Sequence, residues 1–170
     1  INVYSIFGSK LIIAKKSLGQ NFLTDRNILE KIVNVVDIKN KIILEVGPGT
    51  GNLTSFILKK QPKKVFVIEK DDDLAKNLNE NFGEQLTIIN DDILNIDENS
   101  LFDEKVIVFG NLPYNISTEI LSKWIINLKD NFWFDHLILM FQKEVCLLYT
   151  SDAADDSLRV DLGGRRIIKK

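Results

Sequence analysis

The feature that most constrains the fold is the short apolar run 42–46, which leads directly into the glycine-rich turn 47–51. A helical pattern follows this turn, with Leu53, Phe56 and Ile57 on one face. The succession predicts a buried strand, a tight turn and a helix. Because glycine has no Cβ atom, the backbone of such a turn can pass close to a ligand. A plain strand-to-helix turn without a ligand is the alternative.

Apolar runs and helical patterns alternate along the chain. Apolar residues at helical spacing occur around residues 28–36, 53–57, 74–82 and 120–128, and strand-like apolar runs occur at 42–46, 65–68, 86–89, 106–109 and 136–141. This alternation predicts an α/β fold in which a parallel sheet with right-handed crossovers is flanked by helices. The last of these strands would form an unpaired sheet edge, which is a liability for stability.

Acidic residues follow two of the predicted strands. Glu69 comes directly after the run 65–68, and Asp91 and Asp92 follow the run 86–89. The carboxyl ends of parallel strands meet at one edge of a sheet, where ligands bind. An acid in the position of Glu69 is suited to the ribose hydroxyls of a nucleoside, and one at the third strand could bind an adenine amine. Capping of a helix by Asp91 and Asp92 is the alternative.

Glu45 lies inside the first strand, close to the glycine turn. The glycine spacing differs from the dinucleotide-binding fingerprint, and a carboxylate at this point would repel a pyrophosphate. A carboxylate suits a cationic ligand instead. Because the sulfonium and amino groups of S-adenosylmethionine are both cationic, these features favour that molecule as the ligand of the turn.

The segment Asn111-Leu112-Pro113-Tyr114 follows the run 106–109. The exocyclic amine of a base is a poor nucleophile, because its lone pair is delocalised into the ring. The amide oxygen of Asn111 and a backbone carbonyl beside the proline can accept the amine hydrogens and turn the lone pair toward an electrophile. The Tyr114 ring can stack on a base that has been swung out of its helix. Asn-x-Pro is also common in turns, so this segment alone is a weak indicator of such chemistry. The glycine turn strengthens the prediction, because it would hold the electrophile.

Together these segments resemble the KsgA-type ribosomal RNA small-subunit adenine N6-dimethyltransferases. The matching blocks are 16–23, 45–51, Glu69, Asp92, 110–118 and 141–145, so the resemblance covers about residues 10–145. It implies a Rossmann-like class I methyltransferase that uses S-adenosylmethionine as methyl donor and needs no metal. It also implies that the substrate is a pair of adjacent adenosines near the 3′ end of small-subunit ribosomal RNA, each dimethylated at N6 during ribosome biogenesis.

The resemblance further implies which residues form the site. The block 20–23 would close over it from the N-terminal side, although a solvated basic arm is the alternative interpretation of this region. The target base would be handled by the catalytic residues Asn111, Leu112, Pro113 and Tyr114. The donor would contact Gln20, Asn21, Leu23, Glu45, Gly47, Gly49, Glu69, Asp92 and Asn111.

Three segments are expected to differ in organisation. Residues 1–23 are predicted to form an N-terminal arm with the closing motif, and residues 24–145 a partial S-adenosylmethionine-dependent methyltransferase domain. Residues 146–170 do not resemble the family. Back-translated, they resemble the adapters of a DNA sequencing library, so we expect a disordered, non-native tail; a natural divergent tail is the alternative. We therefore expect a fold truncated before its last strands and its helical C-terminal domain, and a chain that is itself inactive on RNA.

The overall charge is slightly acidic, with 22 Lys and Arg against 24 Asp and Glu. RNA-binding proteins are expected to carry a basic face, so RNA affinity would rest on local lysine groups or on the absent helical domain. The groups are Lys10, Lys15 and Lys16, and then Lys59, Lys60, Lys63 and Lys64, of which the second could equally be a solubilising loop.

The remaining composition restricts the cellular setting. The single cysteine, Cys146, excludes a disulfide framework and agrees with a cytoplasmic protein. No segment is long and apolar enough to suggest a membrane span. The single histidine, His136, is expected to pack or to lie on the surface. We expect a monomer whose partner is small-subunit ribosomal RNA or a precursor of the small ribosomal subunit.

Three competing functions fit parts of the pattern. An Erm-type methyltransferase, which modifies large-subunit ribosomal RNA and gives antibiotic resistance, shares the front block and an Asn-x-Pro-Tyr segment. A non-catalytic RNA-binding assembly factor is possible because one fold hosts many functions. A DNA adenine methyltransferase would be distinguished by its activity on duplex DNA.

Overall fold

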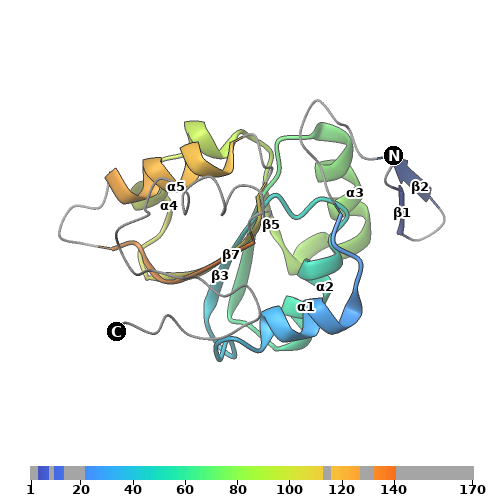
Figure 1. Cartoon of the computed structure of the whole chain (residues 1–170), viewed down its shortest axis with the longest axis horizontal. Coiled ribbons are helices and arrows are strands. Elements are labelled where there is room, and N and C mark those ends of the chain that lie inside the picture. Colours follow the sequence, from blue (N-terminus) through green and yellow to red (C-terminus); the bar gives the residue numbers. More distant parts are fainter. Residues whose placement is uncertain (1–3, 8–9, 14–21, 113–115, 127–131, 141–170) are drawn as a thin grey trace, which may run out of the picture. The chain divides into compact units, whose positions relative to one another are not determined.

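The computed structural model describes residues 4–7, 10–13, 22–112, 116–126 and 132–140. Its main feature is a five-stranded sheet in the order β5-β4-β3-β6-β7, in which all neighbouring strands are parallel (Figure 1). The strands are β3 (Ile42–Val46), β4 (Lys64–Ile68), β5 (Thr87–Ile89), β6 (Val106–Asn111) and β7 (Phe134–Met140). The predicted α/β class with a parallel sheet and flanking helices is confirmed.

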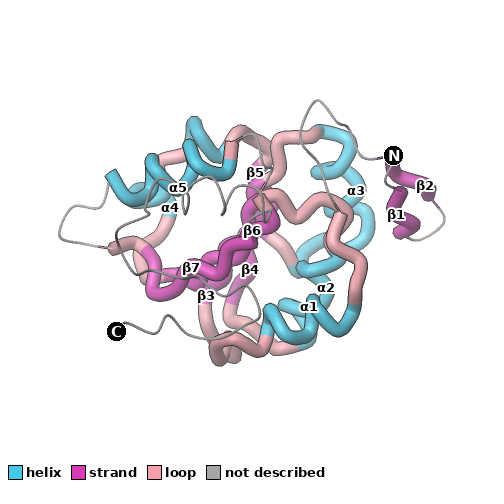
Figure 2. Tube along the Cα trace, in the orientation of Figure 1, coloured by secondary structure: helices cyan, strands magenta, loops and turns pink. Residues whose placement is uncertain are grey.

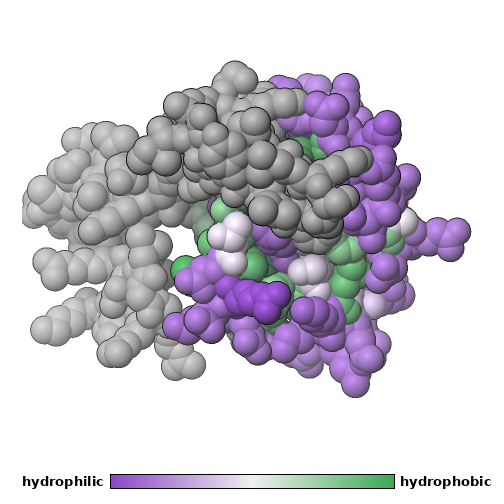
Figure 3. Space-filling model, turned by 90° about the vertical axis from the view of Figure 1, so that its right-hand side faces the viewer, coloured by the Kyte–Doolittle hydropathy of each residue, from purple (hydrophilic) through white to green (hydrophobic). Residues whose placement is uncertain are grey.

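Helices connect successive strands. They are α1 (Arg26–Val33), α2 (Asn52–Lys59), α3 (Asp72–Phe82), α4 (Glu98–Leu101) and α5 (Ser117–Ile126), with two short 3-10 turns, η2 (Gly83–Gln85) and η3 (Ile93–Asn95). Figure 2 shows α1, α2 and α3 on one side of the strands and α4 and α5 on the other. The described surface in Figure 3 is mostly hydrophilic, with smaller hydrophobic areas between, as expected for helices whose apolar stripes face a core.

Alternating strand residues supply two different cores. On the side of α1 and α2, buried residues of the sheet pack against the buried faces of both helices; the cluster includes Leu29, Val33, Ile43, Leu53, Ile57, Val65, Val67, Ile107 and Phe109. The other side is aromatic. Phe102 lies edge-on to Phe66, with ring centroids 5.0 Å apart, and Trp133 lies edge-on to Trp124 of α5 at 5.7 Å.

Three of the described α-helices, α1, α3 and α4, begin at aspartate caps, of which Asp97 is that of α4. The Asp25 side chain accepts hydrogen bonds from the amides of Asn27 and Ile28 at the start of α1. The Asp71 side chain does the same for Asp73 and Leu74 at the start of α3. Such caps satisfy amides that have no partner inside the helix and stabilise each helix by about 1 kcal/mol.

The observed strand limits differ in detail from those predicted. β6 extends past Phe109 and includes Asn111, because it pairs on both sides, with β3 and with β7. An antiparallel pair, β1 (Tyr4–Phe7) and β2 (Lys10–Ile13), was not predicted from the N-terminal segment. Strands of four residues are too short to show a clear alternation of apolar and polar side chains. β7 lies at the edge of the sheet, as predicted.

No helix in the described part of the chain is both long enough and apolar enough to cross a membrane.

Gly51 fixes the approach of α2 to α3. Its backbone has a φ of +81°, and an added Cβ would stand 2.5 Å from the Phe82 ring and 3.0 Å from Leu78. We expect Gly51→Ala to lower the free energy of unfolding by about 1–2 kcal/mol through backbone strain and by a further 1–3 kcal/mol through the clash.

The matched control is Gly47→Ala, because Gly47 has a similar φ of +66° but the nearest atom to its added Cβ is 3.8 Å away. Urea unfolding curves of both variants measure the difference. Equal losses of unfolding free energy for the two variants would contradict the idea that Gly51 is needed for the close approach to α3.

Candidate functional site

Three of the predicted site residues, Gly47, Glu69 and Asn111, lie at the carboxyl ends of neighbouring strands, where the strand order reverses. The chain places β4 and β5 on one side of β3, and then β6 and β7 on the other. The carboxyl ends of β3 and β6 therefore diverge into connections that run in opposite directions, which is where ligands bind in open α/β sheets. Gly47 follows β3, Glu69 follows β4, and Asn111 is the last residue of β6.

The glycine turn lies directly against its neighbours on both sides. The Gly47 amide donates to the carbonyl oxygen of Ile68 at 3.0 Å. On the other side, an added Cβ on Gly47 would stand 3.8 Å from the carbonyl oxygen of Asn111. Both Gly47 and Gly49 have positive φ, which glycine adopts at no steric cost. The structure thus brings together the three strand ends that the sequence analysis singled out.

Glu69 ties the glycine turn to the beginning of α3. One carboxyl oxygen accepts a hydrogen bond from the Gly49 amide at 3.1 Å, and the other accepts one from the Asp71 amide at 2.9 Å. The residue is 6% exposed, and burial raises the pKa of its carboxyl group despite these hydrogen bonds. Each oxygen can accept more than one hydrogen bond, so the group can hold the turn and still accept from a ligand.

Glu45 has a different environment from the one the sequence argument assumed. Its side chain is 2% exposed, and the Thr54 hydroxyl of α2 donates to it at 2.7 Å. Burial raises the pKa of Glu45 to about 8, the Thr54 bond lowers it and the nearby Glu69 charge raises it further. Burial thus favours the uncharged acid over the ionised carboxylate that the sequence argument assumed. A contact between Glu45 and the donor stays a prediction.

Asp92 lies at the end of the third strand and has two partners in the chain. One oxygen accepts from the Leu94 amide at 3.0 Å, so Asp92 caps η3, and the other accepts from the Lys70 ammonium at 2.6 Å. Although burial alone raises the pKa of Asp92, the bonds from Lys70 and Leu94 outweigh it and lower the pKa. Asp92 is thus a partly exposed carboxylate at neutral pH. It caps η3, as one of the two sequence interpretations expected, and this role does not prevent it from also binding a ligand.

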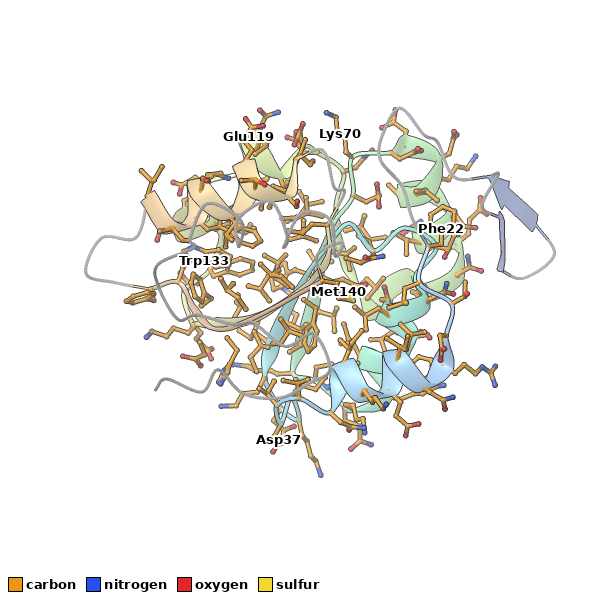
Figure 4. The ribbon with its side chains drawn as sticks, viewed as in Figure 1. Phe22, Asp37, Lys70, Glu119, Trp133 and Met140 are labelled. Carbon is orange, nitrogen blue, oxygen red and sulfur yellow. The ribbon has the colours of Figure 1, made fainter. Side chains whose placement is uncertain are left out.

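Part of the predicted closing block lies against the glycine turn. The side-chain amide of Asn52 donates to the Leu23 carbonyl at 2.9 Å. The Phe22 ring, labelled in Figure 4, would stand 3.2 Å from an added Cβ on Gly49. Gln20 and Asn21 lie outside the described residues, and closure over a bound donor stays a prediction.

Leu112 follows Asn111 and packs beside Gly110. Leu112 is buried, and its side chain would stand 2.9 Å from an added Cβ on Gly110, so the absence of a side chain at Gly110 leaves room for it. Pro113 and Tyr114 lie outside the described residues, so their predicted roles are not tested. α5 begins at Ser117, soon after this loop.

A cluster of polar side chains that the sequence analysis did not identify supports the Asp92 loop. The Lys123 ammonium of α5 donates to the carbonyl oxygens of Ile93 and Ile96 around η3, and to Glu98 at 2.9 Å. The Trp124 indole donates to the same Glu98 oxygen at 2.7 Å. α5 is therefore anchored to the loop that carries Asp92. Sequence spacing gave no signal, because the partners are 25 or more residues apart.

The buried acid Glu45 predicts a pH dependence of stability. Between its ordinary pKa of 4.5 and about 8, the folded state holds a proton that the unfolded state has lost, so stability falls as pH rises and levels off above pH 8. The total loss is at most roughly 5 kcal/mol. We expect Glu45→Gln, which cannot ionise, to gain stability relative to the unmodified chain from about pH 5 to about pH 9.

Urea unfolding at a series of pH values measures this gain. Glu84→Gln, at an exposed glutamate, is the matched control. Parallel pH profiles for Glu45→Gln and the unmodified chain would contradict the assignment of a proton to buried Glu45.

Comparisons with known proteins agree with this geometry. Residues 13–159 match the family model described as ribosomal RNA adenine dimethylase. The chain is 68% identical over 132 residues to "Ribosomal RNA small subunit methyltransferase A" of Pelagibacter ubique, an alignment that covers 78% of this chain and 50% of the relative. The chain spans about half the length of the curated relatives it matches.

Two solved structures share the fold. The 23S rRNA methyltransferase ErmE is 26% identical with a TM-score of 0.64, over 78% of this chain and 52% of that one. A dimethyladenosine transferase from Plasmodium falciparum is 31% identical with a TM-score of 0.59, over 74% of this chain and 45% of that one. The glycine turn, the acids at the strand ends and the asparagine at the end of β6 thus occur in a chain that belongs to the ribosomal RNA adenine dimethylase family.

Proposed function

We propose that this chain carries the methyl-transfer centre of an enzyme that dimethylates N6 of two adjacent adenosines near the 3′ end of small-subunit ribosomal RNA, with S-adenosylmethionine as donor. The observation that carries the proposal is the meeting of Gly47, Glu69 and Asn111 at one sheet edge, where β3, β4 and β6 are in register. Family membership and the names of the relatives support the reaction and the substrate.

The residues present fit a bound donor. The left-handed backbone at Gly47 leaves no Cβ in the way of a ligand that approaches the turn, and the missing Cβ at Gly49 leaves room for the Phe22 ring. The Glu69 carboxyl group is positioned to accept from ribose hydroxyls, and the Asp92 carboxylate from an adenine amine. S-adenosylmethionine, when bound, supplies an electrophilic methyl group.

Asn111 would position the nucleophile. Its side-chain oxygen would accept a hydrogen bond from the adenine amine, and a backbone carbonyl of the following loop would accept a second one. Both bonds turn the nitrogen lone pair toward the methyl carbon, and the Tyr114 ring stacks on the flipped base. A nitrogen–carbon bond forms as the carbon–sulfur bond breaks, and the amine then loses a proton to water. Positioning supplies most of the rate gain in such a reaction.

The site predicts separate effects on donor binding and on transfer. We expect Asn111→Ala to weaken donor binding while leaving it detectable, and to lower the methylation rate by roughly 100- to 1000-fold, by analogy with the loss of one positioned polar group. Asn99→Ala is the matched control, because Asn99 is an exposed asparagine on α4.

Donor binding is measured by calorimetry on the 170-residue chain. Methylation is measured with labelled donor on a chimera that continues residue 145 into the C-terminal half of the Pelagibacter ubique relative. No donor binding by the unmodified chain would overturn the proposed donor site. Unchanged methylation by the Asn111→Ala chimera would overturn the role of this residue.

A second candidate is methylation of an adenine in large-subunit ribosomal RNA, favoured by the structural likeness to ErmE. The small subunit is preferred, because the curated relatives at 68% and 46% identity bear that name. Presenting the chimera with both RNAs separately distinguishes the candidates by which RNA gains the label. A cytoplasmic, monomeric protein that acts on precursors of the small ribosomal subunit remains part of this proposal.

A further inference from the structure

Several lysines lie at the end of the sheet where the strands begin, opposite the candidate site. This lysine edge comprises Lys39, Lys41, Lys60, Lys63, Lys64 and Lys105. Lys41 directly precedes β3, Lys64 is the first residue of β4, and Lys105 directly precedes β6, so the three central strands each begin at a lysine. In Figure 4, Asp37 marks this end of the sheet at the bottom, and Lys70 marks the site end at the top.

Backbone hydrogen bonds hold the two main loops of the lysine edge together. The Asn40 amide donates to the Gln61 carbonyl at 3.0 Å, and the Lys63 amide donates to the Lys41 carbonyl at 2.8 Å. Asn40 and Gln61 both have positive φ, of 58° and 57°, which turns the chain at matching points in the two loops. The lysines therefore project from a fixed backbone, which lowers the entropy that a partner must remove on binding.

Acidic residues at this edge only partly balance the lysines. The acids are Asp37, Asp103, Glu104 and Asp135, and Asp37 accepts from the backbone amide of Lys39. Lys63 pairs with Glu104 at 2.6 Å, but both side chains are more than half exposed, so the pair is weak and open to exchange. The edge has a positive balance in a chain whose formal net charge is −2.

Two further features suit a nucleic-acid partner. The Lys64 ammonium lies over the Phe66 ring, 4.4 Å from its centroid, which restrains the side chain. A surface hollow of about 420 Å³ opens beside Lys39 and Lys60, and its other walls come from the segment 33–38, which includes the polar residues Asn34 and Asp37. The two ammonium groups at this hollow can contact phosphates of a nucleic-acid backbone.

We propose that the lysine edge is a second RNA-binding surface, which contacts phosphates of the substrate RNA roughly 15 Å from the transfer site, about the length of the central strands. The inference rests on the proposed function, because the partner is the RNA substrate of that same reaction. Phosphate contacts position a protein on RNA, and the crevice at the other edge selects the base. An acidic protein needs such a local surface to approach a polyanion.

The test removes two charges from the lysine edge of the 170-residue chain. Lys41→Gln with Lys64→Gln is compared with Arg26→Gln and Lys76→Gln, which removes the same charge from exposed positions on α1 and α3. Affinity for a small-subunit ribosomal RNA fragment is followed by fluorescence anisotropy between about 50 and 200 mM salt. Urea unfolding curves verify that both double variants keep the fold intact.

We expect the edge variant to bind RNA roughly 10-fold more weakly at low salt, with a slope of log affinity against log salt that is shallower by about 1 to 2. The control variant keeps most of the affinity and the slope. Equal losses of RNA affinity in the two variants, or no RNA binding by the unmodified chain, would overturn the proposal that the lysine edge binds RNA.

Donor affinity, measured on the same samples, separates this inference from the proposed function. The lysine edge is far from Glu69 and Asp92, so both variants should bind S-adenosylmethionine as the unmodified chain does. An unmodified chain that binds RNA through the lysine edge but binds no donor would leave the inference standing and overturn the proposed function.

Discussion

The buried carboxyl group of Glu69 links the parts of the site that are distant in sequence. It accepts from the Gly49 amide in the glycine turn and from the Asp71 amide at the start of α3. Its own amide donates to Ile89 at the end of β5, and its carbonyl accepts from the Asn90 side chain. The ends of three strands are thus tied to one residue. Because that residue is buried, little water competes for these hydrogen bonds.

Two neighbouring glutamates have different roles for a physical reason. Glu45 is buried and accepts a hydrogen bond from Thr54 of α2, and burial raises the pKa of its carboxyl group. Glu69 lies at the strand end, where the backbone amides of Gly49, Lys70 and Asp71 oppose part of the effect of burial on its pKa. A charge on Glu69 also raises the pKa of Glu45, because a charge on one disfavours a charge on the other. The Thr54 bond to Glu45 joins α2 to β3, and the bonds to Glu69 join the glycine turn to the start of α3.

The two ends of the sheet have opposite character. Glu69 and Asp92 lie at the carboxyl ends of the strands, and lysines precede the strands at the other end. A parallel sheet produces this separation, because every strand begins at one edge and ends at the other. Residues flanking the strands are therefore sorted by whether they precede or follow a strand. In the proposed function, the donor would bind at the carboxyl ends of the strands and the RNA would also contact the lysine edge.

Much of the fold and of the site was predictable from local pattern. The apolar runs at 42–46 and 65–68 match β3 and β4 within one residue, because buried parallel strands are continuous apolar runs. Gly47, Glu69 and Asn111 were identified as neighbours, since the carboxyl ends of parallel strands share an edge. The β1–β2 pair was missed, because each strand has four residues.

The sequence by itself determined the α/β class and the family, because periodicity and motif spacing are local properties of the chain. Tertiary structure decided the pKa shifts and the hydrogen-bond partners of the acidic site residues. The pKa of Glu45 depends on burial beneath α2, and the pairing of Asp92 with Lys70 depends on the register of β4 and β5. The anchoring of the Asp92 loop by Lys123 and Glu98 likewise joins α5, η3 and α4. Desolvation and contacts between distant residues exist only after the chain has folded, so no local pattern reports them.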